Sequence, residues 1–185
     1  MAALLGRSKT NQGVHIDASL FESQIASLAN VASSYLVAGK EATRWGTAHP
    51  SIVPYQVFGT KDSMLMVGAG NDGQFGKLCN ALGQKDLATD PRFSTNSQRV
   101  ANRETLIGIL DGLFTRETTS HWCDSIGKLG IPIAPIRNIE QTFKHPQSVG
   151  RQVTTEIDHP RAGRITINAP AVRYGESKMQ VRPAR

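Results

Sequence analysis

Residues 55–82 read YQVFGTKDSMLMVGAGNDGQFGKLCNAL, and the expected architecture can be built outward from them. Two short runs of β-forming residues, Tyr55–Phe58 and Met64–Val67, flank a polar turn at Gly59–Ser63. Runs of this length on either side of a turn predict two neighbouring strands. The residues from 74 to 82 then carry apolar side chains at helical spacing and stop at a glycine. The stretch therefore predicts two strands followed by a helix.

A second strong pattern lies upstream of these strands. Apolar residues recur every three or four positions through 20–35, which predicts a single amphipathic helix. Asp17 or Ser19 can cap its beginning, and Gly39 lies where a helix commonly ends in a left-handed residue. The alternation of apolar and polar residues over Val14–Asp17 predicts a short strand before this helix.

The rest of the chain adds further helices and a hairpin. A long amphipathic helix is predicted over Ser97–Phe114, a second over Thr119–Leu129 and a short third over Ile139–Phe143. A hairpin is predicted from Val153–Ile157 and Arg164–Ile167. We therefore expect an α/β protein in which a small domain mixes α and β elements.

The composition is that of an ordinary globular protein and narrows the range of partners. The chain has 185 residues, of which 39% are hydrophobic and 19% charged, so it can bury a core without disulfides or metals. Its net charge of +6 is scattered along the sequence, which argues against nucleic-acid binding. No apolar stretch approaches the roughly 20 residues of a membrane span. Cys79 and Cys123 have no ligand partners nearby, so we expect reduced core thiols and no metal site.

The segment Gly68–Gly73 has the spacing G-x-G-x-x-G between a strand and a helix. In a dinucleotide-binding domain such a turn holds phosphates on the helix N-terminus. That domain also needs a parallel strand with an acidic residue about 20 positions later. Here the region, Asp86–Phe93, is a loop that contains a proline. We therefore favour a plain strand-to-helix turn with Asn71 or Asp72 as the N-cap, and keep dinucleotide binding as an alternative.

The polar loop Lys40–Pro54 carries the most suggestive side chains. Four polar residues lie in or next to its proline-bounded end: His49, Ser51, Tyr55 and Gln56. Prolines stiffen such a segment, and ordered polar loops often bind ligands. A structural loop whose prolines only set its path explains the same residues. No serine, cysteine or aspartate has a base at a readable spacing, so no catalytic residue is predicted.

Several longer strings occur in a fixed order along the chain. They are Arg44–Pro50 (RWGTAHP), Val53–Gln56 (VPYQ), Asp90–Phe93 (DPRF) with Asn96 and Arg99 after it, Gly130–Pro132 (GIP) with Pro135, and Pro170–Tyr174 (PAVRY). Together they resemble the class III CoA-transferases, the CaiB/BaiF type, over nearly the whole chain. Within that family, the first string and Val67–Asn71 (VGAGN) are most similar to the branch that exchanges CoA between succinate and glutarate.

The resemblance implies a Rossmann-like large domain joined to a small α/β domain. It assigns residues 1–45 to the end of the large domain, 46–168 to the small domain and 169–185 to a segment that returns toward the large domain. Family members use an aspartate that attacks an acyl-CoA, and they pass through a mixed anhydride and an enzyme-bound thioester. No position of this sequence matches that aspartate. We therefore expect a fragment that lacks the N-terminal half and is inactive by itself.

The same resemblance implies the substrates and partners. We expect CoA transfer from an acyl-CoA, with succinyl-CoA as the favoured donor, to a short dicarboxylic acid such as glutarate. Coenzyme A thioesters are then substrates, and no cofactor is expected. The substrate is expected to contact residues in the stretch where some members carry a glycine-rich flap, namely His49, Ser51, Tyr55 and Gln56. Family members form interlocked homodimers, and a mitochondrial or cytoplasmic location is expected.

Two alternatives stay open at this point. An acyl-CoA racemase or a carnitine-CoA transferase relative is the alternative within the wider family. A non-catalytic module that retained the fold is the alternative from another class of protein.

Overall fold

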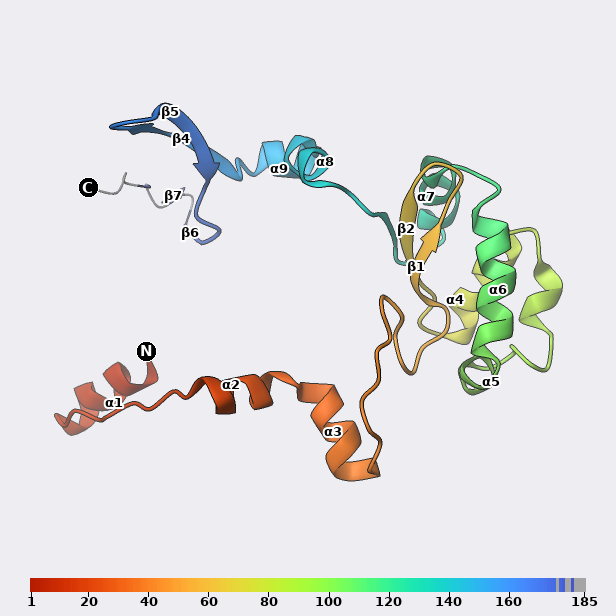
Figure 1. Ribbon diagram of the computed structural model, residues 1–185, viewed down its shortest axis with the longest axis horizontal. Helices are drawn as coiled ribbons and strands as arrows, with labels where there is room; N and C mark the ends of the chain where they lie inside the picture. Colours follow the sequence, from red (N-terminus) through yellow and green to blue (C-terminus); the bar gives the residue numbers. More distant parts are fainter. Residues whose placement is uncertain (176, 179–180, 182–185) are drawn as a thin grey trace. The chain divides into compact units, whose positions relative to one another are not determined.

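The computed structural model describes residues 1–175, 177–178 and 181, and the chain divides into two units (Figure 1). The first unit is Met1–Gly46 and the second is Thr47–Arg185. Helices occur together with small antiparallel sheets, which confirms the α/β class. The predicted domains 1–45, 46–168 and 169–185 stay a prediction, and part of the last, at 176, 179–180 and 182–185, lies outside the described residues.

The first unit contains α1 (Ala2–Thr10), α2 (Leu20–Ser27) and α3 (Ala29–Ala38). Ser19 caps α2 by accepting a hydrogen bond from the Glu22 amide at 3.1 Å, as predicted. Gly39 ends α3 in the left-handed region with a φ of 63°, which is also as predicted. The single helix predicted over 20–35 is wrong, because Ala29 has a φ of 41° and interrupts the right-handed helix there.

The strand predicted at Val14–Asp17 is wrong as well. The residues between α1 and α2 have no regular structure. A strand requires a hydrogen-bonded neighbour, and none of the described strands pairs with this segment.

The apolar face of α2 and α3 is uncovered in this unit. Its large side chains are between 44% and 89% exposed: Leu20, Phe21, Ile25, Leu28, Val31 and Tyr35. No residue of α1, α2 or α3 is buried. Large apolar side chains that stay exposed in such number are typical of surfaces that pack against protein.

The second unit is built on an antiparallel sheet in the order β1 (Tyr55–Gly59), β2 (Met64–Gly68) and β3 (Ile133–Pro135). β1 and β2 confirm the predicted pair, with Tyr55 opposite Gly68 and Gly59 opposite Met64. β3 has no signal in the sequence, because its three residues include a proline and are too few to show a pattern. Because β2 lies between the other two strands, β1 forms one edge of the sheet.

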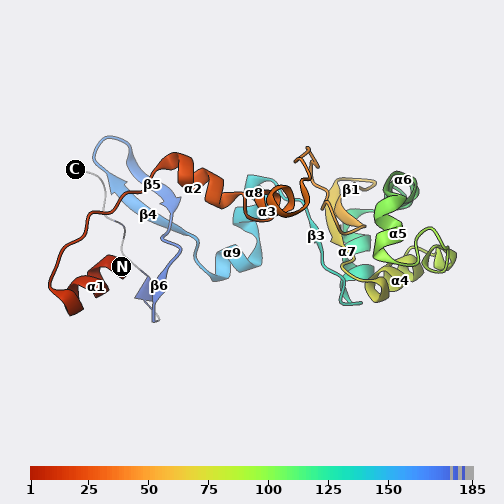
Figure 2. The ribbon, with the colours of Figure 1, turned by 90° about the horizontal axis from the view of Figure 1, so that it is seen from below.

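Four helices lie beside this sheet, as both views show (Figures 1 and 2). They are α4 (Asp72–Ala81), α5 (Asn96–Ala101), α6 (Arg103–Phe114) and α7 (Thr119–Gly127), with the short 3-10 helix η1 (Lys85–Ala88) after α4. The core between them includes Phe58, Leu65, Leu78, Leu110 and Ile126, which are all buried. The long helix predicted over Ser97–Phe114 is broken at Asn102, whose ψ of 28° separates α5 from α6.

The rest of the chain forms small elements of its own. They are α8 (Ile139–Lys144), α9 (Pro146–Gly150), the hairpin of β4 (Thr154–His159) and β5 (Gly163–Asn168), and the short strands β6 (Arg173–Tyr174) and β7 (Ser177–Lys178). The predicted helix α8 and the predicted hairpin are confirmed. Half-buried and exposed residues alternate along β4, so this hairpin has one partly covered face.

Arg99 of α5 is fully buried within the core. Its guanidinium donates to the Val53 carbonyl at 2.6 Å, to the Phe93 carbonyl at 3.0 Å and to Asp72 Oδ1 at 2.8 Å. It also lies 4.4 Å from the centre of the Phe75 ring. A buried charge is costly unless its donors find partners, and here the partners come from three separate segments. Arg99 therefore joins the loop before β1, the loop before α5 and the beginning of α4.

Replacing Arg99 with methionine removes these bonds and leaves two buried carbonyl groups unpaired. We expect Arg99→Met to lower the free energy of unfolding by roughly 3–5 kcal/mol, as measured by urea denaturation. Arg92→Met is the matched control. Arg92 forms an exposed ion pair with Asp90 at 2.7 Å, and its loss should change the stability far less. Equal losses for the two variants would contradict the role assigned to Arg99.

Candidate functional site

The loop before β1 runs along the outer edge of that strand. The His49 amide donates to the Tyr55 carbonyl at 2.8 Å, and the Val57 amide donates to Thr47 Oγ1 at 3.2 Å. These bonds pair main-chain groups that an edge strand leaves open. Of the polar residues predicted from the sequence, His49 and Ser51 therefore lie on an ordered loop held against the sheet, and Tyr55 and Gln56 lie in β1 itself.

The His49 ring stacks on the Tyr55 ring, with ring centres 5.5 Å apart and planes 8° from parallel. Tyr55 in turn lies opposite Gly68 of β2. A Cβ atom at Gly68 would lie 3.3 Å from the Tyr55 ring, which is tighter than an ordinary van der Waals contact. The glycine therefore leaves room for the Tyr55 ring to lie across β2. The Tyr55 ring also packs against the imidazole of His49.

The loop also fixes the protonation pattern of the neutral His49 ring. Its Nδ1 accepts a hydrogen bond from the Ser51 amide at 3.1 Å, which places the ring proton on Nε2. Within the described part of the chain, no acceptor is paired with this Nε2–H. The Ser51 side chain on this loop and the Tyr55 ring at the start of β1 are both exposed. These three side chains form a small polar surface with donors that suit a carboxylate.

Gln56 does not join this surface. Neighbouring residues of a strand point to opposite faces of the sheet, so Gln56 lies on the face opposite to Tyr55. Phe58, two residues after Gln56, lies on the same face as Gln56 and is buried. The structure therefore brings together His49, Ser51 and Tyr55, and it separates Gln56 from them.

The glycine-rich turn does not have the structure of a dinucleotide site. Asn71 caps α4 by accepting from the Gln74 amide at 2.9 Å, as the N-cap prediction requires. Gln74 Oε1 accepts from the Gly70 amide at 2.7 Å, so an amide that a phosphate would use already has a partner. The adjoining sheet is antiparallel, and Asp86–Phe93 contains a 3-10 turn in place of a strand. A dinucleotide domain requires parallel strands, so the alternative is excluded for this turn.

Neither cysteine is placed to act as a nucleophile. Cys79 is fully buried, and burial raises the pKa of its thiol to about 11. Cys123 is half-buried, and burial also raises the pKa of that thiol. Both are free thiols that stay protonated at neutral pH, and a thiol is a far weaker nucleophile than a thiolate.

Among residues 1–175, 177–178 and 181, no group of three or more His, Cys, Asp or Glu side chains is arranged to hold a metal ion. No helix in that part of the chain is both long and apolar enough to cross a membrane.

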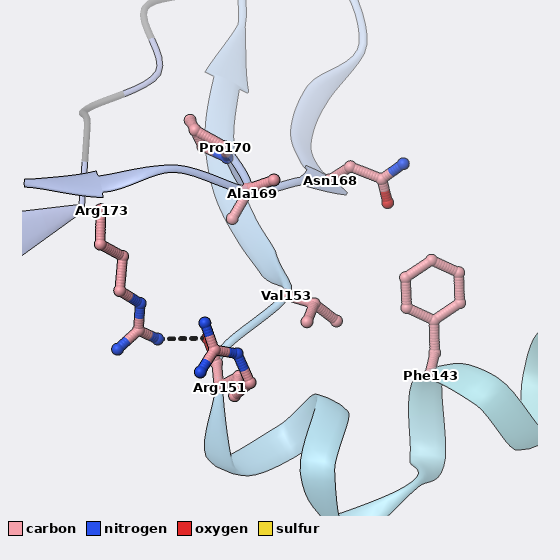
Figure 3. A pocket seen from close by; sticks show the side chains of 8 residues that line it. Phe143, Arg151, Val153, Asn168, Ala169, Pro170 and Arg173 are labelled. Atoms are coloured by element: carbon pink, nitrogen blue, oxygen red, sulfur yellow. Dashed lines mark hydrogen bonds between the residues drawn. The ribbon is translucent and has the colours of Figure 1, made fainter.

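A separate hollow of about 490 Å³ lies beside α9 and β4 (Figure 3). It is lined by apolar groups and by two arginines, among them Phe143, Val153, Pro170, Arg151 and Arg173. The Arg173 guanidinium donates to the Arg151 carbonyl at 2.7 Å (Figure 3). Two guanidinium groups at one hollow favour an anionic ligand over a cationic one. No motif in the sequence signals this hollow, because its residues are spread from α8 to β6.

The substitution Gly68→Ala adds a methyl group next to Tyr55 and tests the stacking of the His49 and Tyr55 rings. We expect Gly68→Ala to displace the Tyr55 ring and to weaken the nuclear Overhauser contacts between the His49 and Tyr55 rings. Because the ring is partly exposed and can move, the melting temperature should fall by no more than about 4 °C. Gly59→Ala is the control, since Gly59 ends β1 and a Cβ there meets no atom within 4 Å. Ring contacts that stay the same in Gly68→Ala would rule out the tight packing described above.

The relatives that resemble most of this chain include CoA-transferases from different organisms. The chain is 45% identical over 184 residues to the succinyl-CoA:glutarate CoA-transferase of Homo sapiens, covering 99% of this chain and 42% of that protein. It is 36% identical over 157 residues to the succinate–glutarate CoA-transferase of Agrobacterium fabrum, covering 85% of this chain and 39% of that protein. The chain thus spans less than half the length of these relatives.

A solved structure that resembles this chain is that of a CaiB/BaiF family protein from Brucella suis. It is 37% identical and superposes with a TM-score of 0.75, over 97% of this chain and 46% of its own. The family model described as CoA-transferase family III matches residues 1–185. Because that match extends over the full sequence, the chain belongs to CoA-transferase family III.

Proposed function

We propose that this chain is the acid-binding part of a CoA-transferase that moves CoA between succinyl-CoA and a short dicarboxylic acid such as glutarate. The observation that carries the proposal is the 45% identity to the human enzyme named for these two acids. The Agrobacterium relative is named for the same two acids. Coenzyme A thioesters are substrates in this proposal, and no resident cofactor takes part.

The polar surface of His49, Ser51 and Tyr55 supports this role. A dicarboxylic acid keeps one carboxylate ionised while the other exchanges CoA, and that charge loses hydration when it binds. Hydrogen-bond donors must replace the lost water, and bonds to an ionised group are the strong ones. The Nε2–H of His49 and the hydroxyl of Ser51 are donors of this kind, on a loop that the sheet holds in place. Gln56 stays a predicted contact, from the other face of β1.

The group that attacks the thioester is not assigned within these residues. The family resemblance implies an aspartate, and no position of residues 1–185 matches it. The thiol of Cys79 stays protonated, since burial raises its pKa to about 11. In this proposal the described segment holds and orients the acid, and no nucleophile is assigned within it.

Assembly as a homodimer is part of the proposal. The uncovered apolar face of α2 and α3 supports a protein partner, since side chains such as Leu20 and Phe21 are 89% and 75% exposed. A mitochondrial or cytoplasmic location stays a prediction. Both named relatives act on dicarboxylic acids, which favours this reaction over the racemase and carnitine alternatives.

A chimeric enzyme tests the proposal. In it, residues 1–185 replace the matching segment of the human relative, to which they are 45% identical over 184 residues. We expect the chimera to form glutaryl-CoA from succinyl-CoA and glutarate, and to form no carnitinyl-CoA, as measured by chromatography of the CoA products. A folded chimera that uses carnitine and not glutarate would overturn the proposed acceptor.

Within the same chimera, His49→Ala should raise KM for glutarate by roughly 10-fold or more. The variant loses a hydrogen bond to an ionised group, and such bonds contribute about 1.5–3 kcal/mol. His121→Ala is the matched control, because His121 is an exposed histidine on α7. Its KM should stay within about twofold of the parent, since surface substitutions away from a site have small effects. If His49→Ala behaves like the control, the assignment of His49 to the substrate is wrong.

A further inference from the structure

The segment 50–53, which joins the His49 ring to β1, forms no helix or strand of its own. Its main-chain groups still need partners, since a buried N–H or C=O without one is costly. The Asn96 side chain accepts from the Val53 amide at 3.2 Å and donates to the Ser51 carbonyl at 2.8 Å. Arg103 donates to the Pro50 carbonyl at 2.7 Å. Together with Arg99, these residues hold the segment from α5 and α6.

Three clamp residues hold this segment: Asn96, Arg99 and Arg103. Asn96 and Arg99 lie three residues apart on α5, and Arg103 is the first residue of α6 after the break at Asn102, yet all three reach the same segment. They lie more than 40 residues after the segment that they hold. Polar side chains from so far along the chain converge on the loop that carries His49.

One of these bonds acts on the imidazole through a single peptide group. The Pro50 carbonyl and the Ser51 amide belong to the same planar peptide unit and point in opposite directions. Arg103 donates to the carbonyl end at 2.7 Å, and the amide end donates to His49 Nδ1 at 3.1 Å. The guanidinium therefore fixes the plane of the peptide that orients the ring. A cationic donor on the carbonyl also polarises the peptide and strengthens the amide as a donor.

We infer that Arg103 is a positioning residue, which sets the orientation and the tautomer of His49 through the Pro50–Ser51 peptide. Asn96 supports it by holding the next carbonyl, that of Ser51. The inference deepens the proposed function and rests on it, because the oriented Nε2–H is the donor offered to the acid substrate. Burial lowers the pKa of Arg103 from its ordinary value, yet a guanidinium stays charged at neutral pH.

Amide exchange and ring contacts in the 185-residue chain test the positioning itself. In Arg103→Met, we expect the Ser51 amide to exchange on the order of 10-fold faster, since a bond to a charged group is lost. The nuclear Overhauser contacts between the His49 and Tyr55 rings should weaken in the same variant. Arg103→Lys keeps a charged donor and should recover at least half of both effects. Arg116→Met, just beyond α6, is the matched control and should change neither.

Asn96→Asp provides a second, independent variant. The carboxylate still accepts from the Val53 amide but repels the Ser51 carbonyl to which the amide group donated. An acidic residue in the first turn of α5 is favourable, so the helix itself should not be weakened. Faster exchange of the Ser51 amide is expected here too. If Arg103→Met does not fold, Arg103→Gln is measured in its place, because it also removes the charged donor to the Pro50 carbonyl. Unchanged Ser51 exchange and ring contacts in that variant would overturn the inference.

The chimeric enzyme connects positioning to the substrate. Arg103→Met should raise KM for glutarate by about 10-fold while kcat stays within about threefold, and Arg103→Lys should restore most of the loss. Unchanged Ser51 exchange and unchanged ring contacts in Arg103→Met would overturn the inference. Faster exchange with an unchanged KM would overturn its link to the substrate. A parent chimera without glutarate activity would count against the proposed function alone, because exchange in the 185-residue chain still decides the positioning role.

Discussion

The buried guanidinium of Arg99 is the constraint on which the rest of the second unit depends. An ionised group within an apolar core is tolerated only where its donors are matched, and the matching oxygens belong to Val53, Phe93 and Asp72. Val53 and Phe93 lie in two separate loops and Asp72 begins α4, and none of the described strand pairings joins these three segments. The Arg99 guanidinium therefore holds these three segments together. The apolar core formed by β1, β2, α4, α6 and α7 surrounds this side chain.

This arrangement makes the candidate site an extension of the core. The segment before β1 is held from α5 and α6, and the His49 ring rests on Tyr55, which itself lies over Gly68. A binding loop with so many fixed main-chain groups loses little conformational entropy when a ligand arrives. The loop loses its conformational entropy when the protein folds, before any ligand binds. The side chains that stabilise the loop before β1 therefore also hold the candidate site, and they come from both α5 and α6.

Much of this fold can be predicted from local sequence patterns, and the reasons for the exceptions are physical. β1, β2, α7 and the β4–β5 hairpin follow from apolar spacing and from turn residues, which act over a few positions. The breaks at Ala29 and Asn102 are set by backbone angles that the apolar pattern does not encode. β3 is defined only by its pairing with β2, since its sequence is too short to signal a strand.

In the candidate site, too, local sequence patterns predict some residues, and contacts between distant residues decide the others. His49, Ser51 and Tyr55 could be identified from their proline-bounded loop. Gln56 could be placed on the opposite face only after β1 was known, because the face depends on the strand. The role of Arg103 has no local signal, since its acceptor lies 53 residues earlier in the chain. Distant main-chain contacts of this kind become visible only in three dimensions.

The position of the loop on the open edge of β1 has a consequence for how this protein can change over evolution. An uncovered edge strand is a template for pairing with other chains, and natural proteins block such edges to avoid aggregation. Here the blocking segment is the one that carries His49. Under the proposed function, a substitution that loosens this loop to admit a new acid also unblocks the edge. New acyl specificities are therefore expected to arise through exchanges of exposed side chains such as Ser51, with the path of the backbone preserved.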